Sequence, residues 1–182
     1  LFRSKLDGDG QMDAGQISRL VGPIIRGEAD YTKGNRFYSP ENIAPMPIIR
    51  IVGNAGLSFF AKLSTGYWEI FDPSNGFTAI QAKVARILPL EKVSQRYFFE
   101  TDMLFRLSTL RAVVSDIPMK SVYGNERSNL NVLHSLITFP FLHATNFVKR
   151  IVYNYFVRDF NIATINLVLG IAMLVFGFVF GV

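Results

Sequence analysis

The chain has 182 residues, a length that accommodates one globular domain of roughly 100–150 residues and an attached segment. Its net charge is +5, but the basic residues are scattered and no aromatic-basic motif accompanies them, which argues against a nucleic-acid-binding protein. The sequence contains no cysteine, which excludes disulfides and thiolate metal sites and is consistent with a reducing compartment.

The sharpest polar motif, Asp7-Gly8-Asp9-Gly10-Gln11, lies near the start of the chain. On an extended segment alternate residues point to the same side, so Asp7, Asp9 and Gln11 can present three oxygens to one ion. Such hard ligands favour Mg²⁺ or Mn²⁺ held together with the phosphates of a substrate. The motif therefore predicts a divalent metal site.

Two other interpretations of this motif stay open. An EF-hand loop would make the segment a calcium-binding module, but it would place Lys5 and Gln16 at positions that require Asp and Glu. A plain surface turn is the second alternative, because Asp and Gly are ordinary turn residues.

Helices and strands are expected to alternate up to about residue 130, which indicates an α/β sheet. Hydrophobic periodicity predicts helices at residues 17–25, 48–63 and 99–110 and short strands at 30–33 and 112–117. Segments rich in Pro, Asn, Ser and Gly predict loops at 34–47 and 71–76. So few strands suggest that the sheet is incomplete.

Residues 131–159 read as an amphipathic helix in which Pro140 should cause a kink or a division. The mixture of basic residues with aromatic and aliphatic surface is typical of a helix at the membrane interface. Packing of the apolar face against the globular zone is the alternative, and both can hold in part.

The C-terminal residues 162–182 carry no charge, and at 1.5 Å per residue they give roughly 30 Å of helix, enough to span a bilayer. Lys149, Arg150 and Arg158 precede this span, so the positive-inside rule places the globular zone in the cytoplasm. Gly177 and Gly181 lie one turn apart and predict close packing with another helix, in the same chain or in a homo-oligomer. A start at Leu and an end within an apolar run suggest a fragment.

Several motifs appear in order along the chain: Asp7-Gly8-Asp9-Gly10-Gln11-Met12-Asp13, Lys33-Gly34-Asn35-Arg36-Phe37, Asp72-Pro73-Ser74-Asn75-Gly76-Phe77, Phe98-Phe99-Glu100-Thr101-Asp102 and Tyr123-Gly124-Asn125-Glu126-Arg127-Ser128. This set resembles the family 2 glycosyltransferases, especially the branch of dolichol-phosphate mannosyltransferase and bacterial polyprenyl-phosphate glycosyltransferases. The resemblance implies an α/β fold with an incomplete GT-A-type (Rossmann-like) domain at residues 1–130. Juxtamembrane amphipathic helices at 131–159 and a transmembrane helix at 160–182 would follow.

The resemblance also assigns roles to residues. It implies a metal and diphosphate site at Asp7, Asp9 and Gln11. It implies phosphate or donor contacts at Arg36, Arg50, Arg127 and Ser128, although Asn54 stands where the family has Ser after Arg50. It implies a sugar and acceptor loop at Asp72, Ser74, Asn75 and Gly76. Glu100 and Asp102 match an acidic pair near the acceptor and are the expected catalytic residues.

The implied activity is inverting transfer of a sugar from a nucleotide-sugar donor to a polyprenyl (dolichyl or undecaprenyl) phosphate, for glycan or cell-envelope biosynthesis. A membrane glycosyltransferase acting on a polysaccharide or glycolipid hydroxyl is the alternative, and there Glu100 or Asp102 would take a proton. The expected location is the cytoplasmic face of a membrane, the bacterial inner membrane rather than the endoplasmic reticulum. The family's first strands lie upstream of the Asp-x-Asp motif, so we expect the chain to lack part of the donor pocket and to be inactive alone.

Overall fold

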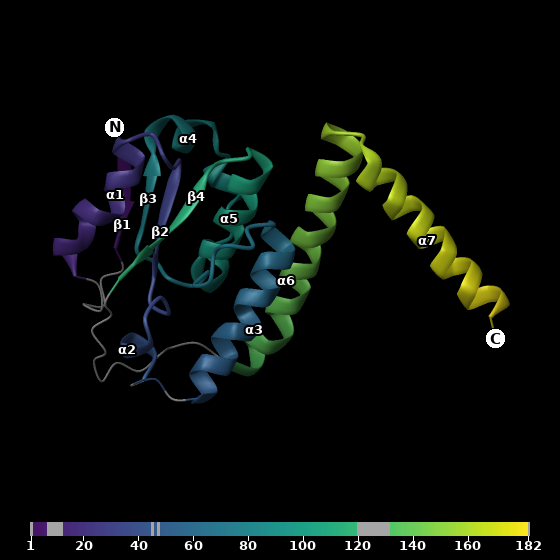
Figure 1. Cartoon of the computed structure of the whole chain (residues 1–182), viewed down its shortest axis with the longest axis horizontal. Coiled ribbons are helices and arrows are strands. Elements are labelled where there is room, and N and C mark those ends of the chain that lie inside the picture. Colours follow the sequence, from purple (N-terminus) through teal and green to yellow (C-terminus); the bar gives the residue numbers. More distant parts are fainter. Residues whose placement is uncertain (1, 7–12, 45, 47, 120–131, 182) are drawn as a thin grey trace.

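The computed structural model describes residues 2–6, 13–44, 46, 48–119 and 132–181. Four short strands form one mixed sheet in the order β1-β3-β2-β4 (Figure 1). Their bounds are β1 Phe2–Lys5, β2 Tyr31–Asn35, β3 Thr78–Gln81 and β4 Val114–Pro118. β2 and β4 pair parallel, whereas β3 is antiparallel to both β1 and β2. β1, β2 and β4 therefore run in the same direction, and their carboxyl ends lie at one edge of the sheet.

Helices cover both faces of this sheet. Their bounds are α1 Ile17–Ile25, α2 Pro40–Ile43, α3 Ile48–Thr65, α4 Ala82–Ile87, α5 Phe99–Thr109, α6 Val132–Val152 and α7 Ile162–Phe180. Short 3-10 turns span Ala14–Gln16, Leu90–Lys92 and Arg96–Phe98, and a π-helical turn spans Tyr153–Arg158.

The sheet separates two apolar cores, as the period-2 alternation of strand side chains requires. On one side α1 packs Leu20, Val21 and Ile24 against Phe77 and Ala79. On the other side α5 packs against β2 and β4, with a core formed by Tyr31, Met103, Leu104, Leu107 and Val114. Two glycines of positive φ follow helices and end them, Gly27 after α1 and Gly66 after α3.

The expected helices are confirmed as α1, α3 and α5, and the expected strands as β2 and β4, displaced by one or two residues. β1 and β3 were not expected, and the loop predicted at 34–47 contains the single-turn helix α2. Of the two effects predicted at Pro140, the division is wrong, because α6 continues through this residue, and the kink stays a prediction. Pro140 is exposed, so water can satisfy the backbone carbonyl that its missing N–H leaves without a partner.

One face of α6 lies on α3 and α5, with His143 and Asn146 buried there. Its other face exposes Ile137, Phe141 and Val148 to solvent. Packing against the globular zone is thus confirmed for one face, and the membrane-interface role of the other stays a prediction.

The helix α7 stands apart from the rest of the molecule (Figure 1). Its N-terminus has a capping box, in which Asn161 Oδ1 accepts from the Ala163 N–H and Thr164 Oγ1 accepts from the Asn161 N–H. Almost all of its apolar side chains are exposed. Within the described part of the chain, α7 alone is long and apolar enough to cross a membrane.

Candidate functional site

Polar side chains gather at the edge where β1, β2 and β4 end. The register aligns Lys5 of β1 with Thr78 of β3, Thr78 with Lys33 of β2, and Lys33 with Asp116 of β4. The segments that continue from these three strands all leave at this edge. Ligands of open α/β sheets characteristically bind outside the carboxyl ends of the strands. This edge is therefore the candidate site.

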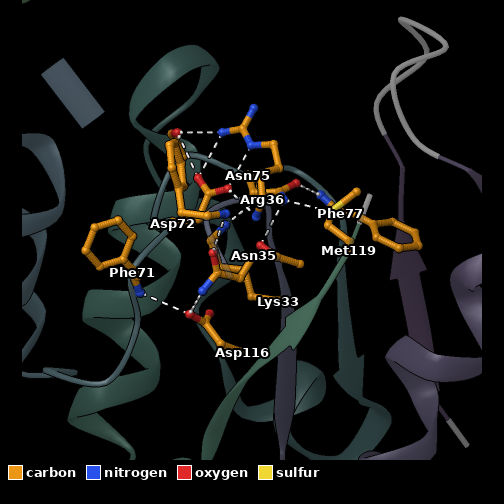
Figure 2. Close-up of polar contacts among 12 residues, drawn as sticks. Lys33, Asn35, Arg36, Phe71, Asp72, Asn75, Phe77, Asp116 and Met119 are labelled. Atoms are coloured by element: carbon orange, nitrogen blue, oxygen red, sulfur yellow. Dashed lines mark hydrogen bonds and ion pairs between the residues drawn. The ribbon is translucent and has the colours of Figure 1, made fainter. Parts of the chain in front are cut away.

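An ion pair between Arg36 and Asp72 lies at the centre of this edge (Figure 2). Arg36 follows β2, and Asp72 belongs to the loop that precedes β3. Arg36 donates from Nε to Asp72 Oδ2 at 2.7 Å and from Nη2 to Oδ1 at 2.9 Å. Arg36 Nη2 also donates to Ser74 Oγ at 3.2 Å. Asp72 is fully buried, so this bidentate pair compensates a charge that has lost its water.

Hydrogen bonds between β2 and Asn75 attach the loop that contains Asp72 to the sheet. The Lys33 amine is buried and donates to the Asn75 carbonyl, while Asn75 Nδ2 donates to the Gly34 carbonyl at 2.8 Å. Burial lowers the pKa of Lys33 to about 8, although the neighbouring carboxylates of Asp72 and Glu100 act in the opposite direction. A Cβ atom at position 34 would lie very close to the Met119 sulfur and the Asn75 amide, so a larger residue there would require the Met119 side chain to move. The adjoining Gly76 is buried too.

Asp116 is a half-buried acid at this edge that sequence reasoning missed. Its Oδ2 accepts from Asn35 Nδ2 at 2.8 Å and from the Phe71 N–H at 3.0 Å. Burial is the main reason that its pKa rises to about 6. The available signal was a charged residue in the middle of a short strand, and it applies equally to Lys33.

The two acids of α5 have different surroundings. Glu100 accepts from Lys5 Nζ at 2.6 Å and thus joins the cluster at the sheet edge. Asp102 points to another part of the molecule, where it accepts from the Ser94 N–H at 2.8 Å, from Asn146 Nδ2 at 3.1 Å and from Arg106. The structure therefore brings Arg36, Asp72, Ser74, Asn75 and Glu100 together but places Asp102 against α6.

Other expected site residues lie outside the described part of the chain. These are Asp7, Asp9, Gln11, Arg127 and Ser128, together with the side chain of Arg50 on α3. The described residues contain no group of three His, Cys, Asp or Glu side chains able to hold a metal ion. The metal site at the Asp-x-Asp motif lies outside the described residues and stays a prediction.

No protein-family model matches the chain. It is similar to a UDP-N-acetylglucosamine–dolichyl-phosphate N-acetylglucosaminyltransferase of Methanococcus voltae, with 29% identity over 117 residues. That match covers 64% of this chain and 46% of the relative. An uncharacterized protein of Methanocaldococcus jannaschii is 25% identical over 127 residues, which cover 68% of this chain and 52% of the relative.

The similarity supports a glycosyltransferase relationship at a coarse level. The chain spans about half the length of the curated relatives it matches. The mixed α/β sheet is consistent with this relationship, and the apolar α7 suggests membrane association. The similarity does not extend to the GT-A fold, the branch of the family or the metal, which stay predictions.

Proposed function

We propose that the chain is part of a family 2, GT-A-type enzyme that transfers a sugar from a nucleotide-sugar donor to a polyprenyl phosphate at a membrane. The observation that carries this proposal is the basic and acidic cluster at the sheet edge, in a chain similar to a dolichyl-phosphate sugar transferase. The donor and the acceptor both carry phosphate, so the site needs cationic side chains held in a fixed geometry. Asp72 holds the Arg36 guanidinium in such a geometry.

In this proposal Arg36 contacts substrate phosphate, with Arg50, Arg127 and Ser128 as further phosphate contacts. Asp7, Asp9 and Gln11 would hold Mg²⁺ or Mn²⁺. The bound ion would supply neutralisation of the charge that develops on the departing diphosphate. The loop with Asp72, Ser74, Asn75 and Gly76 would shape the sugar and acceptor pocket, since Lys33 and Arg36 anchor it to β2.

A phosphate acceptor fits the cluster better than a hydroxyl acceptor does. A phosphate monoester is largely ionised at neutral pH and can attack the anomeric carbon with little help from a base. A new bond then forms from the phosphate oxygen to that carbon while the bond to the diphosphate breaks, with inversion. A hydroxyl would need a general base, yet Asp102 accepts three hydrogen-bonding groups and Glu100 is paired with Lys5.

The proposed location is the cytoplasmic side of a membrane. Three observations support membrane attachment: α7 is apolar along its length, Lys149, Arg150 and Arg158 precede it, and α6 exposes apolar side chains. A polyprenyl phosphate resides in the bilayer, so this attachment would bring acceptor and site together.

A radiolabel assay tests the function. An intact protein that contains this chain, solubilised in detergent, would receive UDP-N-acetylglucosamine or another labelled nucleotide sugar, dolichyl phosphate, and either Mg²⁺, Mn²⁺ or EDTA. We expect metal-dependent label in an organic-soluble lipid product, and none with dolichol, which lacks the phosphate. Label on a hydroxyl acceptor alone, with no lipid-phosphate product, would contradict the proposal.

The metal assignment predicts a specific loss. Asp9→Ala removes a ligand and no core volume, so metal-dependent transfer should fall by more than about 10²-fold while the circular dichroism spectrum is unchanged. Asp13→Ala is the matched control, because Asp13 caps the 3-10 turn before α1 through a bond to the Gly15 N–H. Full transfer by Asp9→Ala would reject the assignment, and micromolar calcium binding without transfer would favour the EF-hand alternative.

A further inference from the structure

A single oxygen of Asp116 joins the two chain segments that carry the Arg36–Asp72 pair (Figure 2). One donor to Asp116 Oδ2 is the side chain of Asn35, the residue immediately before Arg36. The other donor is the backbone N–H of Phe71, the residue immediately before Asp72. Asp116 therefore accepts a hydrogen bond from the residue that precedes each partner of the ion pair.

The neighbouring contacts extend this arrangement on both sides. Asn35 Oδ1 accepts from the Phe37 N–H at 2.8 Å, so the Asn35 side chain fixes the backbone on which Arg36 is carried. The Arg36 N–H itself donates to Asp72 Oδ2 at 3.2 Å. A change of a few tenths of an ångström in the position of Asn35 or Phe71 would thus be transmitted to the ion pair.

Asp116 is also held firmly itself. Its position is fixed by parallel pairing of β4 with β2, in which Asp116 lies opposite Lys33. Its second oxygen, Oδ1, is buried and has no hydrogen-bond partner among the described residues. A buried carboxylate with one unsatisfied oxygen costs free energy, and that cost is difficult to explain by fold stability alone.

We propose that Asp116 is a positioning residue, which sets the geometry of the Arg36–Asp72 pair by holding Asn35 and Phe71 with one oxygen. The role of Arg36 toward substrate phosphate rests on the proposed function, but the positioning of the ion pair does not. What Asp116 must supply is an acceptor oxygen at a fixed place. Asp116→Asn retains such an oxygen, whereas Asp116→Ala removes it.

The direct test measures the Arg36 Nε–H by NMR of the detergent-solubilised chain with ¹⁵N-labelled arginine. In the wild type this proton bonds to Asp72 and should exchange slowly with solvent. We expect exchange about tenfold faster in Asp116→Ala, as for loss of one hydrogen bond to a charged group, and near-normal exchange in Asp116→Asn. Arg106, whose Nε bonds to Asp102, is an internal control that should be unchanged in every variant.

A purely structural role predicts a different result. Asp116→Ala would then lower the melting temperature, but folded molecules would keep a protected Arg36 Nε–H, and this outcome would overturn the proposal. If Asp116→Ala fails to fold, Asn35→Ala removes one of the two hydrogen bonds to Asp116 Oδ2 and should give the same faster exchange of the Arg36 Nε–H. Normal Arg36 protection in Asn35→Ala would equally reject the proposal.

Kinetics separate this inference from the proposed function. With transfer to dolichyl phosphate, Asp116→Ala should raise the KM for a phosphate-bearing substrate by about tenfold with a smaller change in kcat, and Asp116→Asn should restore it. If the wild type transfers no sugar at all, the proposed function fails, and the Arg36 exchange still decides whether Asp116 positions the pair. A loss confined to kcat with normal KM would contradict the positioning role.

Discussion

At the scale of single residues, the candidate site consists of charged side chains whose partners lie on different elements of the fold. Lys33, Asp72 and Asp116 are brought together by the register of β2 with β4 and by the loop before β3. Two of the acids have basic partners, Asp72 with Arg36 and Glu100 with Lys5. Lys33 instead donates to the Asn75 backbone carbonyl. Its buried charge is therefore not neutralised by a carboxylate hydrogen bond, and the stability of the fold should depend on whether Lys33 is protonated.

The buried Lys33 predicts a rise of stability with pH. Its pKa is about 8 in the folded chain and near 10.5 when unfolded, so between these values the unfolded chain binds more protons. The free energy of unfolding should therefore increase from pH 8 upward, by at most about 3 kcal/mol. The increase is best measured below about pH 9.5. Above that pH, Tyr31 and Tyr67 lower the free energy of unfolding, because burial raises their pKa values in the folded chain.

Denaturant unfolding of the wild type and of Lys33→Met across pH 7.5–9.5 measures this effect. The methionine variant removes the amine but keeps an apolar chain of similar length, so its stability should be flat in this window. Parallel pH profiles of the two proteins would show that Lys33 does not carry a depressed pKa.

At the scale of elements, buried long-range polar contacts tie α6 to the helices α3 and α5. Asp102 on α5 bonds to Asn146 on α6, and Ser64 Oγ on α3 lies 2.8 Å from His143 Nδ1 on α6. Burial lowers the pKa of His143 to about 4, so its ring is neutral at neutral pH. These contacts explain why one face of α6 is committed to packing despite an amphipathic pattern typical of an interfacial helix.

Asp102 should thus behave as a structural residue of this junction. Asp102→Ala leaves the Ser94 N–H, Arg106 and Asn146 without their acceptor, and we expect it to lower the free energy of unfolding by about 2–4 kcal/mol. Thermal melts of Asp102→Ala and Asp102→Asn, together with transfer rates at a temperature where both are folded, provide the measurement. A variant as stable as the wild type that has lost transfer would instead restore the general-base role expected from the sequence.

The elements differ in how well the sequence predicts them, for a physical reason. α1, α3 and α5 are set by local periodicity, which a linear sequence displays. β1 and β3 are only four residues long and become strands by pairing with distant segments, which periodicity cannot show. The Arg36 and Asp72 site residues were found through ordered motifs, but Asp116 and Lys33 were missed because their proximity depends on strand register.

At the scale of the whole molecule, a packed α/β body is joined to an exposed apolar helix by a short elbow. The π-helical turn Tyr153–Arg158 and the hydrogen bond from Thr164 Oγ1 to the Tyr155 carbonyl form this elbow. Arg111 of the body pairs with Asp159 beside it. Of the two glycines that the sequence predicts to pack against another helix, a methyl group at Gly177 would meet no nearby atom, whereas one at Gly181 would meet the Gly177 carbonyl. The packing partner itself stays a prediction.

The position of a charge within α7 should decide whether the helix inserts. Ile171→Arg puts a guanidinium near the middle of the expected span, where insertion costs about 3 kcal/mol. Ile162→Arg places the same group at the first residue of α7, from which it can reach the interface. Alkaline carbonate extraction of membranes should release the first variant and retain the second. Equal retention of both variants would argue that α7 does not cross the bilayer.

The strand order has a consequence for synthesis of the chain. Among the described strands, β2 and β3 are the one pair of sequence neighbours that bond to each other, and β1 must wait for β3 to leave the ribosome. At about 5–20 residues per second this leaves a strand edge unprotected for several seconds. The parallel partner β4 arrives later still, yet before the apolar α7 emerges. Strand edges therefore stay unpaired in both intervals, at β1 and β2 until β3 emerges and at β2 until β4 emerges, and a chaperone that shields them would be needed until shortly before the apolar helix α7 emerges.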